Sequence, residues 1–489
     1  MDVLRHARSL RALHPVRNAI VLLLAACATN PVTGRREISL VSESQEIAMG
    51  QEADPAITIQ MGGLYPDSAI QQYTRAIGLD MATGSERPNL PWSFKVLDDD
   101  LINAFAVPGG FIYITRGILA HMNSEAELAA VLGHEIGHVT ARHSASQMTR
   151  AQLAQIGLGV GMIFSETVRG VSDAAMAGLQ VLFLKFGRDD ERQSDELGFR
   201  YMTQARYDPD GMTDVMQMLN STRPEGGAGV PNWLSSHPDP GDRVQANEAR
   251  IAAANTDYSA YTVDRDEFIQ LLDNIVFGED PRQGYFIGQR FFQPVLAFQL
   301  TFPNGWAVQN SPLAVQSMSP SQDAAMSLSF AQANSAAEAA TAFSSTEGIT
   351  IVGTRNENPN GIATRLMEFR AATQQGQLAG LIAFLEYGNS VYQILGYGTA
   401  QGWGSHQNAL LNGVRSFRRL TDRRYTDVQP QRVDIVRLPS AMSFAQFMQR
   451  YPSTVPAEEI ARINQVAVEE QLPTGRLMKR VQGGRVPTS

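Results

Sequence analysis

The stretch that decides the fold is His134-Glu135-Ile136-Gly137-His138, in which two histidines four residues apart enclose a glutamate. Because residues four apart lie one above the other on the same face of a helix, both imidazoles can reach one cation. Zinc accepts such nitrogen ligands, and the glutamate can take a proton from a water molecule that zinc activates. The pattern predicts His134 and His138 as metal ligands and Glu135 as the catalytic base. The alternative is a pair of core histidines that ordinary hydrogen bonds satisfy.

The residues before this stretch have the pattern of a helix start. Ser124 and Glu127 form the S-x-x-E pattern of a capping box. Ala130 and Val131 follow helical spacing with both histidines, so we expect the histidines to face inward with the apolar residues. A buried pair of histidines needs a partner, and a metal ion is a common one.

A catalytic zinc ion needs a third protein ligand if its fourth position is to stay open for water. The acidic stretch 187–198 supplies two candidates, because Glu191 and Asp195 stand four apart and fall on one face of a second helix. One carboxylate would bind the metal, while the other holds the free nitrogen of a ligand histidine. A charged, solvated helix end has the same charge pattern, so the residues alone leave both interpretations open.

These separated motifs resemble those of a known peptidase family. The segment 134–143, followed by Arg188-x-x-Glu191-x-x-x-Asp195, is similar to the gluzincin metallopeptidases of the HtpX and CAAX-prenyl-endopeptidase type. The similarity is greatest to their periplasmic lipoprotein branch, which includes the BepA-like envelope proteases, and it covers roughly residues 35–250.

The resemblance implies a role for each matched residue. It implies that one zinc ion per chain is held by His134, His138 and Glu191. It also implies that Glu135 is the catalytic base and that Asp195 orients a ligand histidine.

A further match lies upstream, in Asn103-Ala104-Phe105-Ala106-Val107-Pro108-Gly109-Gly110 and the β-rich run 111–117. In the family this region supplies the strand beside the active-site cleft. An exposed strand edge holds an extended peptide by main-chain hydrogen bonds, which suits a protease of broad specificity. An ordinary buried strand is the alternative. The residues expected to contact substrate are Asn103, Ala104, Phe105, Gly109 and Gly110.

Residues 235–243 are rich in turn formers and resemble a His-Pro segment near the active site of the family. Two roles follow as hypotheses. His237 would occupy the open zinc position or the mouth of the cleft and regulate access, and Arg243 would stabilise the oxyanion of the tetrahedral intermediate. A surface loop whose arginine caps the next helix is the alternative. His121 and His143 are assigned structural roles, because His143 falls on the opposite side of the helix from His134.

The N-terminal residues predict the compartment. Four arginines precede the apolar run 19–26, which stops at Cys27, the only cysteine. This is typical of a secretory signal whose core is too short to span a bilayer. Leu24-Ala25-Ala26-Cys27 resembles the bacterial lipobox, which implies a signal peptide 1–26 and lipidation at Cys27. A buried, inert cysteine is the alternative. Ala28 follows in place of an inner-membrane retention aspartate, so attachment to the outer membrane, facing the periplasm, is expected.

Composition sets further limits. A length of 489 residues is enough for two or three domains, and a net charge of −9 speaks against a nucleic-acid-binding protein. Charges interrupt the apolar stretch 151–187, which is predicted to form helices that pack over the site, with contact to a membrane surface as the alternative. We expect an α+β fold: a mainly helical zincin-type peptidase domain with a small sheet at 27–255, a linker at 256–285, and an antiparallel α+β domain of unknown role at 286–422.

Residues 430–482 suggest a strand, two helices and a strand. Asn464 and the Leu472-x-x-Gly475 spacing resemble a LysM module, which in its family binds the N-acetylglucosamine backbone of peptidoglycan. A structural cap without a ligand is the alternative, because fold resemblance alone does not carry function.

Together these observations predict a lipid-anchored zinc endopeptidase of the bacterial periplasm. The resemblance implies unfolded or misassembled envelope proteins as substrates. Two other functions stay open: a zinc-containing chaperone or scaffold with an occluded site, and a zinc hydrolase that acts on peptidoglycan peptides.

Overall fold

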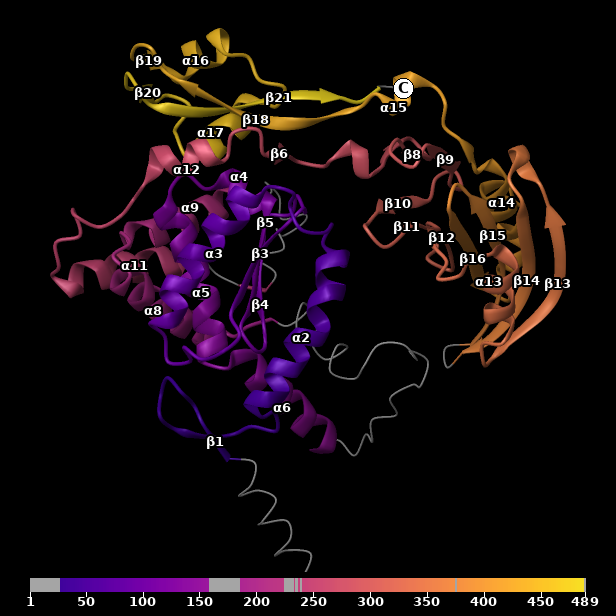
Figure 1. Cartoon of the computed structure of the whole chain (residues 1–489), viewed down its shortest axis with the longest axis horizontal. Coiled ribbons are helices and arrows are strands. Elements are labelled where there is room, and N and C mark those ends of the chain that lie inside the picture. The colour runs from indigo at the N-terminus through magenta and orange to yellow at the C-terminus, as the bar shows by residue number, and fades with distance from the viewer. Residues whose placement is uncertain are drawn as a thin grey trace, which may run out of the picture. The chain divides into compact units, whose positions relative to one another are not determined.

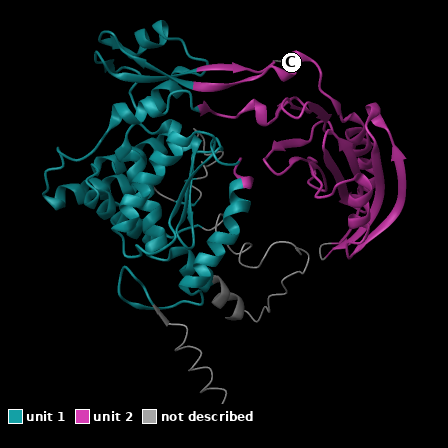
Figure 2. Ribbon diagram, viewed as in Figure 1, with its two compact units in different colours: residues 1–58, 63–275, 433–481 teal, residues 59–62, 276–432, 482–489 magenta. Residues whose placement is uncertain are grey.

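The computed structural model describes residues 27–157, 185–223, 233, 236–237, 240–373 and 376–487. The predicted signal peptide and most of the stretch 151–187 lie outside these residues. The chain divides into two compact units (Figures 1 and 2). Unit 1 comprises residues 1–58, 63–275 and 433–481, and unit 2 comprises residues 59–62, 276–432 and 482–489.

Unit 1 is mainly helical in its described part, as the sequence predicts, and contains a small sheet and a short hairpin (Figure 1). Its helices before residue 275 are α2 (Glu43–Gln60), α3 (Ser68–Thr83), α4 (Arg116–His121), α5 (Glu125–Thr140), α6 (His143–Gly157), α8 (Arg188–Gln204), α9 (Asp210–Ser221), α11 (Pro240–Ala254) and α12 (Arg265–Leu271). Its strands in this part are β1 (Cys27–Thr29), β2 (Arg36–Ile38), β3 (Ser93–Leu97), β4 (Ala104–Val107) and β5 (Phe111–Thr115). None of the helices in the described residues is long and apolar enough to cross a lipid bilayer.

Helix α5 carries the two histidines and lies at the centre of unit 1. All of its residues from Ala126 to Thr140 are buried, so the expected one-sided apolar stripe is in fact a helix enclosed on every side. Glycines let α8 approach closely: a Cβ at Gly137 would lie 3.0 Å from Ser194 O, and one at Gly198 would lie 2.9 Å from His134 N. This close approach places the carboxylates of α8 beside the histidines of α5.

The small sheet has the strand order β3-β5-β4. β5 pairs with β3 in parallel and with β4 antiparallel, and all five of its residues are buried. The strand predicted at 111–117 is therefore an ordinary buried strand at the centre of the sheet. β3 and β4 are the two edge strands, and β4 contains two of the residues expected to contact substrate, Ala104 and Phe105.

Unit 2 contains the antiparallel sheet expected for 286–422, with the strand order β10-β11-β12-β16-β15-β14-β13. The strands are β10 (Ala307–Asn310), β11 (Val315–Met318), β12 (Ala324–Phe330), β13 (Ile349–Glu357), β14 (Thr364–Thr373), β15 (Gly376–Tyr387) and β16 (Ser390–Thr399). A second sheet has the order β17-β9-β8-β7, from β7 (Tyr285–Ile287), β8 (Arg290–Gln293), β9 (Phe298–Thr301) and β17 (Arg418–Arg419).

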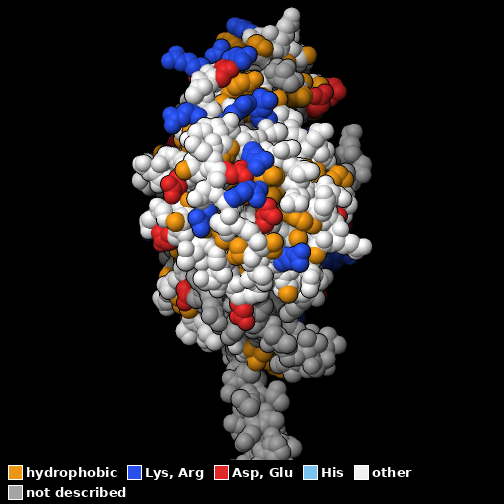
Figure 3. All heavy atoms as spheres, turned by 90° about the vertical axis from the view of Figure 1, so that its right-hand side faces the viewer, with side chains coloured by type: hydrophobic (Ala, Val, Ile, Leu, Met, Phe, Trp, Pro, Cys, Tyr) orange, Lys and Arg blue, Asp and Glu red, His pale blue; other side chains and the backbone are white. Residues whose placement is uncertain are grey.

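Two helices cover opposite faces of the seven-stranded sheet. α14 (Trp403–Ser416) packs with Leu381 in one core cluster, and α13 (Ala336–Ser344) packs with Ile382 in another. Neighbouring residues of a strand point to opposite faces, so the two helices lie on different sides. On the face of the molecule in Figure 3, hydrophobic side chains are scattered among polar ones.

The C-terminal segment has the predicted order of strand, helix, helix and strand. Its elements are β18 (Gln429–Arg437), α16 (Phe444–Arg450), α17 (Ala457–Asn464) and β21 (Leu477–Arg485), with the short pair β19 (Met442–Ser443) and β20 (Gln471–Leu472) between them. Residues 433–481, called the C-terminal module from here on, belong to unit 1.

The stretch 256–285 is not a linker throughout, which corrects the expected boundary. It contains α12, the short strand β6 (Val276–Phe277) and the start of β7. Phe268 and Ile269 of α12 have no exposed surface, because these apolar side chains are part of the core of unit 1.

Candidate metal centre and active site

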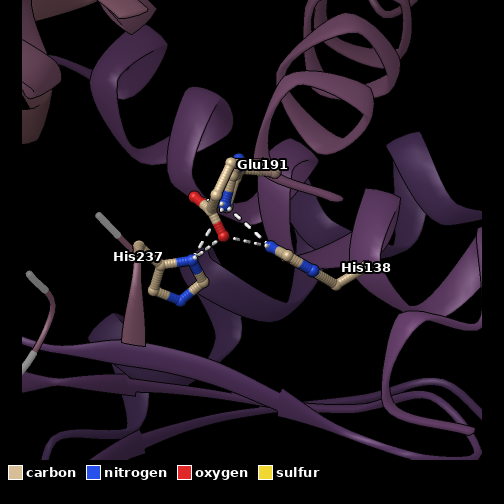
Figure 4. A group of neighbouring side chains, drawn as sticks. His138, Glu191 and His237 are labelled. Atoms are coloured by element: carbon tan, nitrogen blue, oxygen red, sulfur yellow. Dashed lines mark hydrogen bonds and ion pairs between the residues drawn. The ribbon is translucent and has the colours of Figure 1, made fainter. Parts of the chain in front are cut away.

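Four side chains from three parts of unit 1 converge on one point. His134 and His138 come from α5, Glu191 from α8, and His237 from the segment before α11. Each offers one ligand atom, these atoms lie within 4.8 Å of one another, and all four residues are buried. Figure 4 shows the imidazoles of His138 and His237 directed at the carboxylate of Glu191. The structure thus brings together the three predicted metal ligands and His237, which was predicted at the open zinc position or the mouth of the cleft.

The separations suit a tetrahedral metal ion. Nε2 of His134 lies 3.0 Å from Nε2 of His138 and 3.2 Å from Nδ1 of His237. Oε1 of Glu191 lies 2.9 Å from Nδ1 of His237 and 3.4 Å from Nε2 of His138. Ligand atoms at the usual bond lengths around a tetrahedral zinc ion are about 3.3 Å apart. The residues therefore fit zinc as a four-coordinate group.

The second ring nitrogen of His134, Nδ1, also favours metal binding at this site. Nδ1 of His134 lies 2.9 Å from Oδ1 of Asp195, an acceptor, so this nitrogen carries the proton. Burial lowers the pKa of His134 to about 3, so its ring is neutral and Nε2 presents a lone pair. That lone pair faces three other ligand atoms in a buried site, an arrangement that a cation stabilises.

Arg243 joins the carboxylates behind the ligands. Its Nε and Nη2 donate to Asp195 at 2.7 and 2.6 Å, and its Nη1 lies 2.9 Å from Oε2 of Glu191. Burial alone would raise the pKa of both carboxyl groups. Arg243 and His134 instead hold the pKa of Asp195 at about 2, and His237, His138 and Arg243 hold that of Glu191 well below its usual range. Both are therefore ionised, as a ligand and a ligand-orienting group must be.

Glu135, the predicted base, lies at the edge of this cluster. Burial raises the pKa of Glu135 to about 7, a value suited to taking and returning a proton near neutral pH. The backbone amide of Ala106, on the edge strand β4, lies close to this carboxylate and opposes part of the rise in pKa. Oε1 of Glu135 lies 3.7 Å from Nε2 of His237. Base, edge strand and ligands thus meet in one place.

His143 was predicted to lie away from the site, and that prediction is wrong. α5 ends at Thr140, Arg142 adopts a left-handed φ of 59°, and α6 begins at His143. This break turns His143 back, so that its Nδ1 lies 2.9 Å from Nδ1 of His138 and its Nε2 lies 2.9 Å from Oε1 of Gln193. Extrapolating one continuous helix missed it, because no glycine or proline marks the break.

Two aromatic residues that the sequence did not single out cover the cluster. The ring of Trp233 stacks on His237, with centroids 4.1 Å apart and planes at 20°. The ring of Phe186 lies over His138 at 4.0 Å. Both aromatic side chains are buried, at 2% and 9% exposure, and their positions depend on tertiary contacts that no local sequence pattern reveals.

The residues expected to bind substrate lie on and around β4. Asn103 precedes the strand, and its backbone nitrogen is bonded to Oγ1 of Thr115 at 3.2 Å. Gly109 and Gly110 form the turn between β4 and β5, with φ values of 88° and 96°. A Cβ at Gly109 would lie 2.7 Å from Cα of Ile47, so these glycines serve the turn and the packing of α2. Their contact with substrate stays a prediction.

Residues 68–251, which contain every residue of this cluster, match the profile of peptidase family M48. This part of the chain is an M48 zinc-metallopeptidase domain. The M48 domain resembles curated relatives at modest identity. The beta-barrel assembly-enhancing protease of Yersinia pestis is 29% identical over 230 residues, or 45% of this chain and 47% of that protein. That of Escherichia coli (strain K12) is 28% identical over 243 residues, or 45% and 48% of the two chains.

A mitochondrial protein is also similar. The mitochondrial metalloendopeptidase OMA1 of Arabidopsis thaliana is 30% identical over 174 residues, which cover 35% of this chain and 34% of that protein. The chain spans about half the length or less of these relatives. Among solved structures, cyanobacterial PsbP from Synechocystis sp. PCC 6803 has a TM-score of 0.23 at 15% identity and covers 29% of this chain and 96% of that chain. A superposition this poor assigns neither a fold nor a role.

Proposed function

We propose that this chain is a zinc-dependent endopeptidase of the bacterial cell envelope, with unfolded or misassembled envelope proteins as substrates. One observation carries the proposal: a buried set of four metal-ligand side chains with Glu135 directly beside it. When bound, zinc supplies Lewis-acid chemistry, which polarises a carbonyl and lowers the pKa of a water molecule.

The residues of the chain divide the remaining work. His134, His138 and Glu191 hold the metal, and Asp195 fixes the ring of His134 through Nδ1. Glu135 accepts the proton of the attacking water at its carboxylate and returns it to the nitrogen of the leaving amine. Arg243 donates two hydrogen bonds to Asp195 and forms an ion pair with Glu191, so we assign it the positioning of these carboxylates, while oxyanion stabilisation remains the sequence-based hypothesis.

The edge strand β4 is the proposed binding site for an extended peptide. One side of the strand pairs with β5, and Ala106 lies close to Glu135. Main-chain groups of Ala104 and Ala106 would pair with a substrate strand and bring its peptide bonds past the base. Such pairing uses main-chain groups and does not depend on the side chains of the substrate, which agrees with unfolded proteins as substrates. The names of the relatives from Yersinia pestis and Escherichia coli support a role in β-barrel assembly.

We propose that His237 would fill the fourth ligand position and so inhibit the resting enzyme. Its Nδ1 faces the other ligands and its Nε2 faces Glu135, so one ring occupies the place where water and the base would meet. The same geometry favours the second candidate function, a chaperone or scaffold whose zinc site is occluded.

The test is degradation of casein by residues 28–489, comparing wild type with Glu135→Gln and measuring the zinc content of both. Zinc in both proteins with cleavage only by wild type supports the peptidase and its base together. Zinc in both with cleavage by neither, even after His237→Ala, would contradict the peptidase and favour the scaffold.

Lipid attachment at Cys27, facing the periplasm, is a further part of the proposal, and it rests on the lipobox pattern. Cys27→Ser should move the protein from the membrane fraction to the soluble fraction, and continued membrane association would contradict the anchor. Peptidoglycan binding by the C-terminal module stays a proposal as well, which co-sedimentation of the full chain with purified sacculi would test.

A further inference from the structure

Lys479 of β21 is completely buried, with no exposed surface. Its Nζ donates to the carbonyl oxygens of Ala120 at 2.9 Å and Met122 at 2.7 Å. These carbonyls belong to the end of α4 and to the residue that follows it, and Met122 precedes the N-cap of α5, Ser124, by two positions. A residue of the C-terminal module is thus hydrogen-bonded to the segment just before α5, the helix that carries two of the metal ligands.

Other side chains also form hydrogen bonds between the C-terminal module and the start of α5. Nδ2 of Asn123 donates to the carbonyl of Ile463 at 3.1 Å. Nε2 of Gln465 donates to the carbonyl of His121 at 3.2 Å and to Oε2 of Glu127 at 2.8 Å. The ring of His121 lies 3.3 Å from the carboxylate of Glu459. Buried, directional bonds of this kind fix an orientation, which apolar contact alone does not.

The start of α5 depends on the same groups. Oγ of Ser124 accepts from the amide of Glu127 at 3.2 Å, as the predicted capping box requires. The carboxylate of Glu127, however, accepts from the amide of Asn123 at 3.0 Å and from Gln465. One member of the helix cap is therefore shared with the C-terminal module.

The choice of lysine at this position is informative. The chain has only three lysines, Lys95, Lys185 and Lys479, and otherwise uses arginine. An arginine cannot lose its proton in a protein, whereas a buried lysine can. Burial lowers the pKa of Lys479 to about 7, against a smaller raising effect of Glu127. A neutral amine still donates hydrogen bonds to the two carbonyls.

We propose that Lys479 is a positioning residue for catalysis. Through Lys479, the C-terminal module fixes the start of α5, and this in turn fixes the positions of the metal ligands of α5 relative to Glu191. This rests on the proposed peptidase function. His134 lies seven residues after Glu127, about two turns of a stiff helix, so a shift at the start of α5 moves the ligands with it. The C-terminal module is then a part of the catalytic framework and not a tethered accessory.

The first test compares Lys479→Met with Lys185→Met in the full chain, because Lys185 is exposed and offers a matched lysine loss. At a temperature well below unfolding, Lys479→Met should keep its zinc and its KM but lose between about ten- and a hundredfold in kcat, the cost of misplaced reacting groups. Lys185→Met should match wild type. An unchanged kcat in folded, zinc-loaded Lys479→Met would overturn the proposal.

Two readouts do not need activity, so they separate this proposal from the peptidase proposal. In the wild-type chain, acetylation by an amine-reactive ester should be at least about a hundredfold slower at Lys479 than at Lys185. Equal rates would show an undocked module and overturn the proposal. In Co²⁺-loaded protein, Lys479→Met should change the visible absorption bands that report ligand geometry. An unchanged spectrum would also contradict positioning.

If Lys479→Met fails to fold, Gln465→Ala replaces it, because this change removes two other hydrogen bonds between the C-terminal module and the start of α5 and leaves the lysine in place. We expect faster acetylation of Lys479 together with a lower kcat. Faster acetylation with an unchanged kcat would overturn the proposal.

Discussion

Nδ1 of His143 lies 2.9 Å from Nδ1 of His138, on the side of the His138 ring that faces away from the metal ligands. Burial, followed by the neighbouring His138, lowers the pKa of His143 to about 4, so its ring is neutral. Because Nε2 of His143 lies 2.9 Å from the acceptor Oε1 of Gln193, its Nδ1 is free to accept the proton of His138. His143 therefore fixes the tautomer that leaves Nε2 of His138 as a ligand.

His143→Ala should lower zinc affinity by about ten- to a hundredfold, because the outer partner of a ligand histidine fixes its tautomer and ring orientation. Competition with a chromophoric chelator measures the affinity. His406→Ala, which changes a histidine of unit 2, is the control and should bind zinc as wild type does. Equal affinities in both variants would show that His143 only fills space.

Asp195→Ala should destabilise the metal-free protein as well as weaken zinc binding. Arg243 is 6% exposed and donates two hydrogen bonds to Asp195, so removing the carboxylate leaves its charge paired with Glu191 alone. Breaking a buried pair of this kind costs about 3–5 kcal/mol. Chemical denaturation in the presence of a chelator measures the loss. A change below about 1 kcal/mol would mean that Arg243 finds another partner.

His237→Ala should raise the basal rate of casein cleavage by about tenfold or more, because the remaining three ligands leave the fourth position open. Zinc content should stay at one per chain. Ser236→Ala is the neighbouring control, since its hydroxyl donates to the carbonyl of Trp233 at 3.2 Å and Ser236 is not one of the clustered ligand side chains. A basal rate that does not rise in His237→Ala would contradict self-inhibition.

The pH dependence of stability should report Lys479. Burial lowers its pKa from 10.5 to about 7 on folding, while the charge of Glu127 opposes this shift and that of Arg265 adds to it. Between these values the unfolded chain binds more protons than the folded chain, so this contribution grows as the pH rises from 7 and is lost as the pH falls through 7. The slope is at most about 1.4 kcal/mol per pH unit.

Thermal unfolding between pH 7 and 10 measures this contribution. The rise in Tm should be smaller in Lys479→Met than in wild type, and Lys185→Met should keep the wild-type rise. The same rise in all three proteins would show that Lys479 keeps an ordinary pKa in the folded chain.

The parts of the site that the sequence predicts well are those with short-range spacing. His134, Glu135 and His138 share one helix and Glu191 and Asp195 share another, so periodicity alone places each set on one face. The sequence does not reveal how α5 and α8 cross, which depends on close approach at Gly137 and Gly198. The sequence also cannot show that β4 lies at an edge of the sheet and β5 at its centre, because both strands are apolar and only their pairing distinguishes them.

The same limit applies to longer connections. The spacing of the final segment predicts two strands and two helices but not the burial of Lys479 against the end of α4, about 360 residues away in sequence. His143 was misplaced for the opposite reason, because a local left-handed residue, Arg142, ends a helix that its sequence would continue.

The stacking of Trp233 on His237 gives the proposed inhibition an optical signature. The indole is almost fully enclosed and lies against the imidazole at 4.1 Å, so His237 cannot leave the ligand cluster without changing the surroundings of the indole. Displacement of the ring by a peptide would therefore alter the emission of a tryptophan that the chain already carries. The opening of the enzyme can be followed in real time without attaching a label.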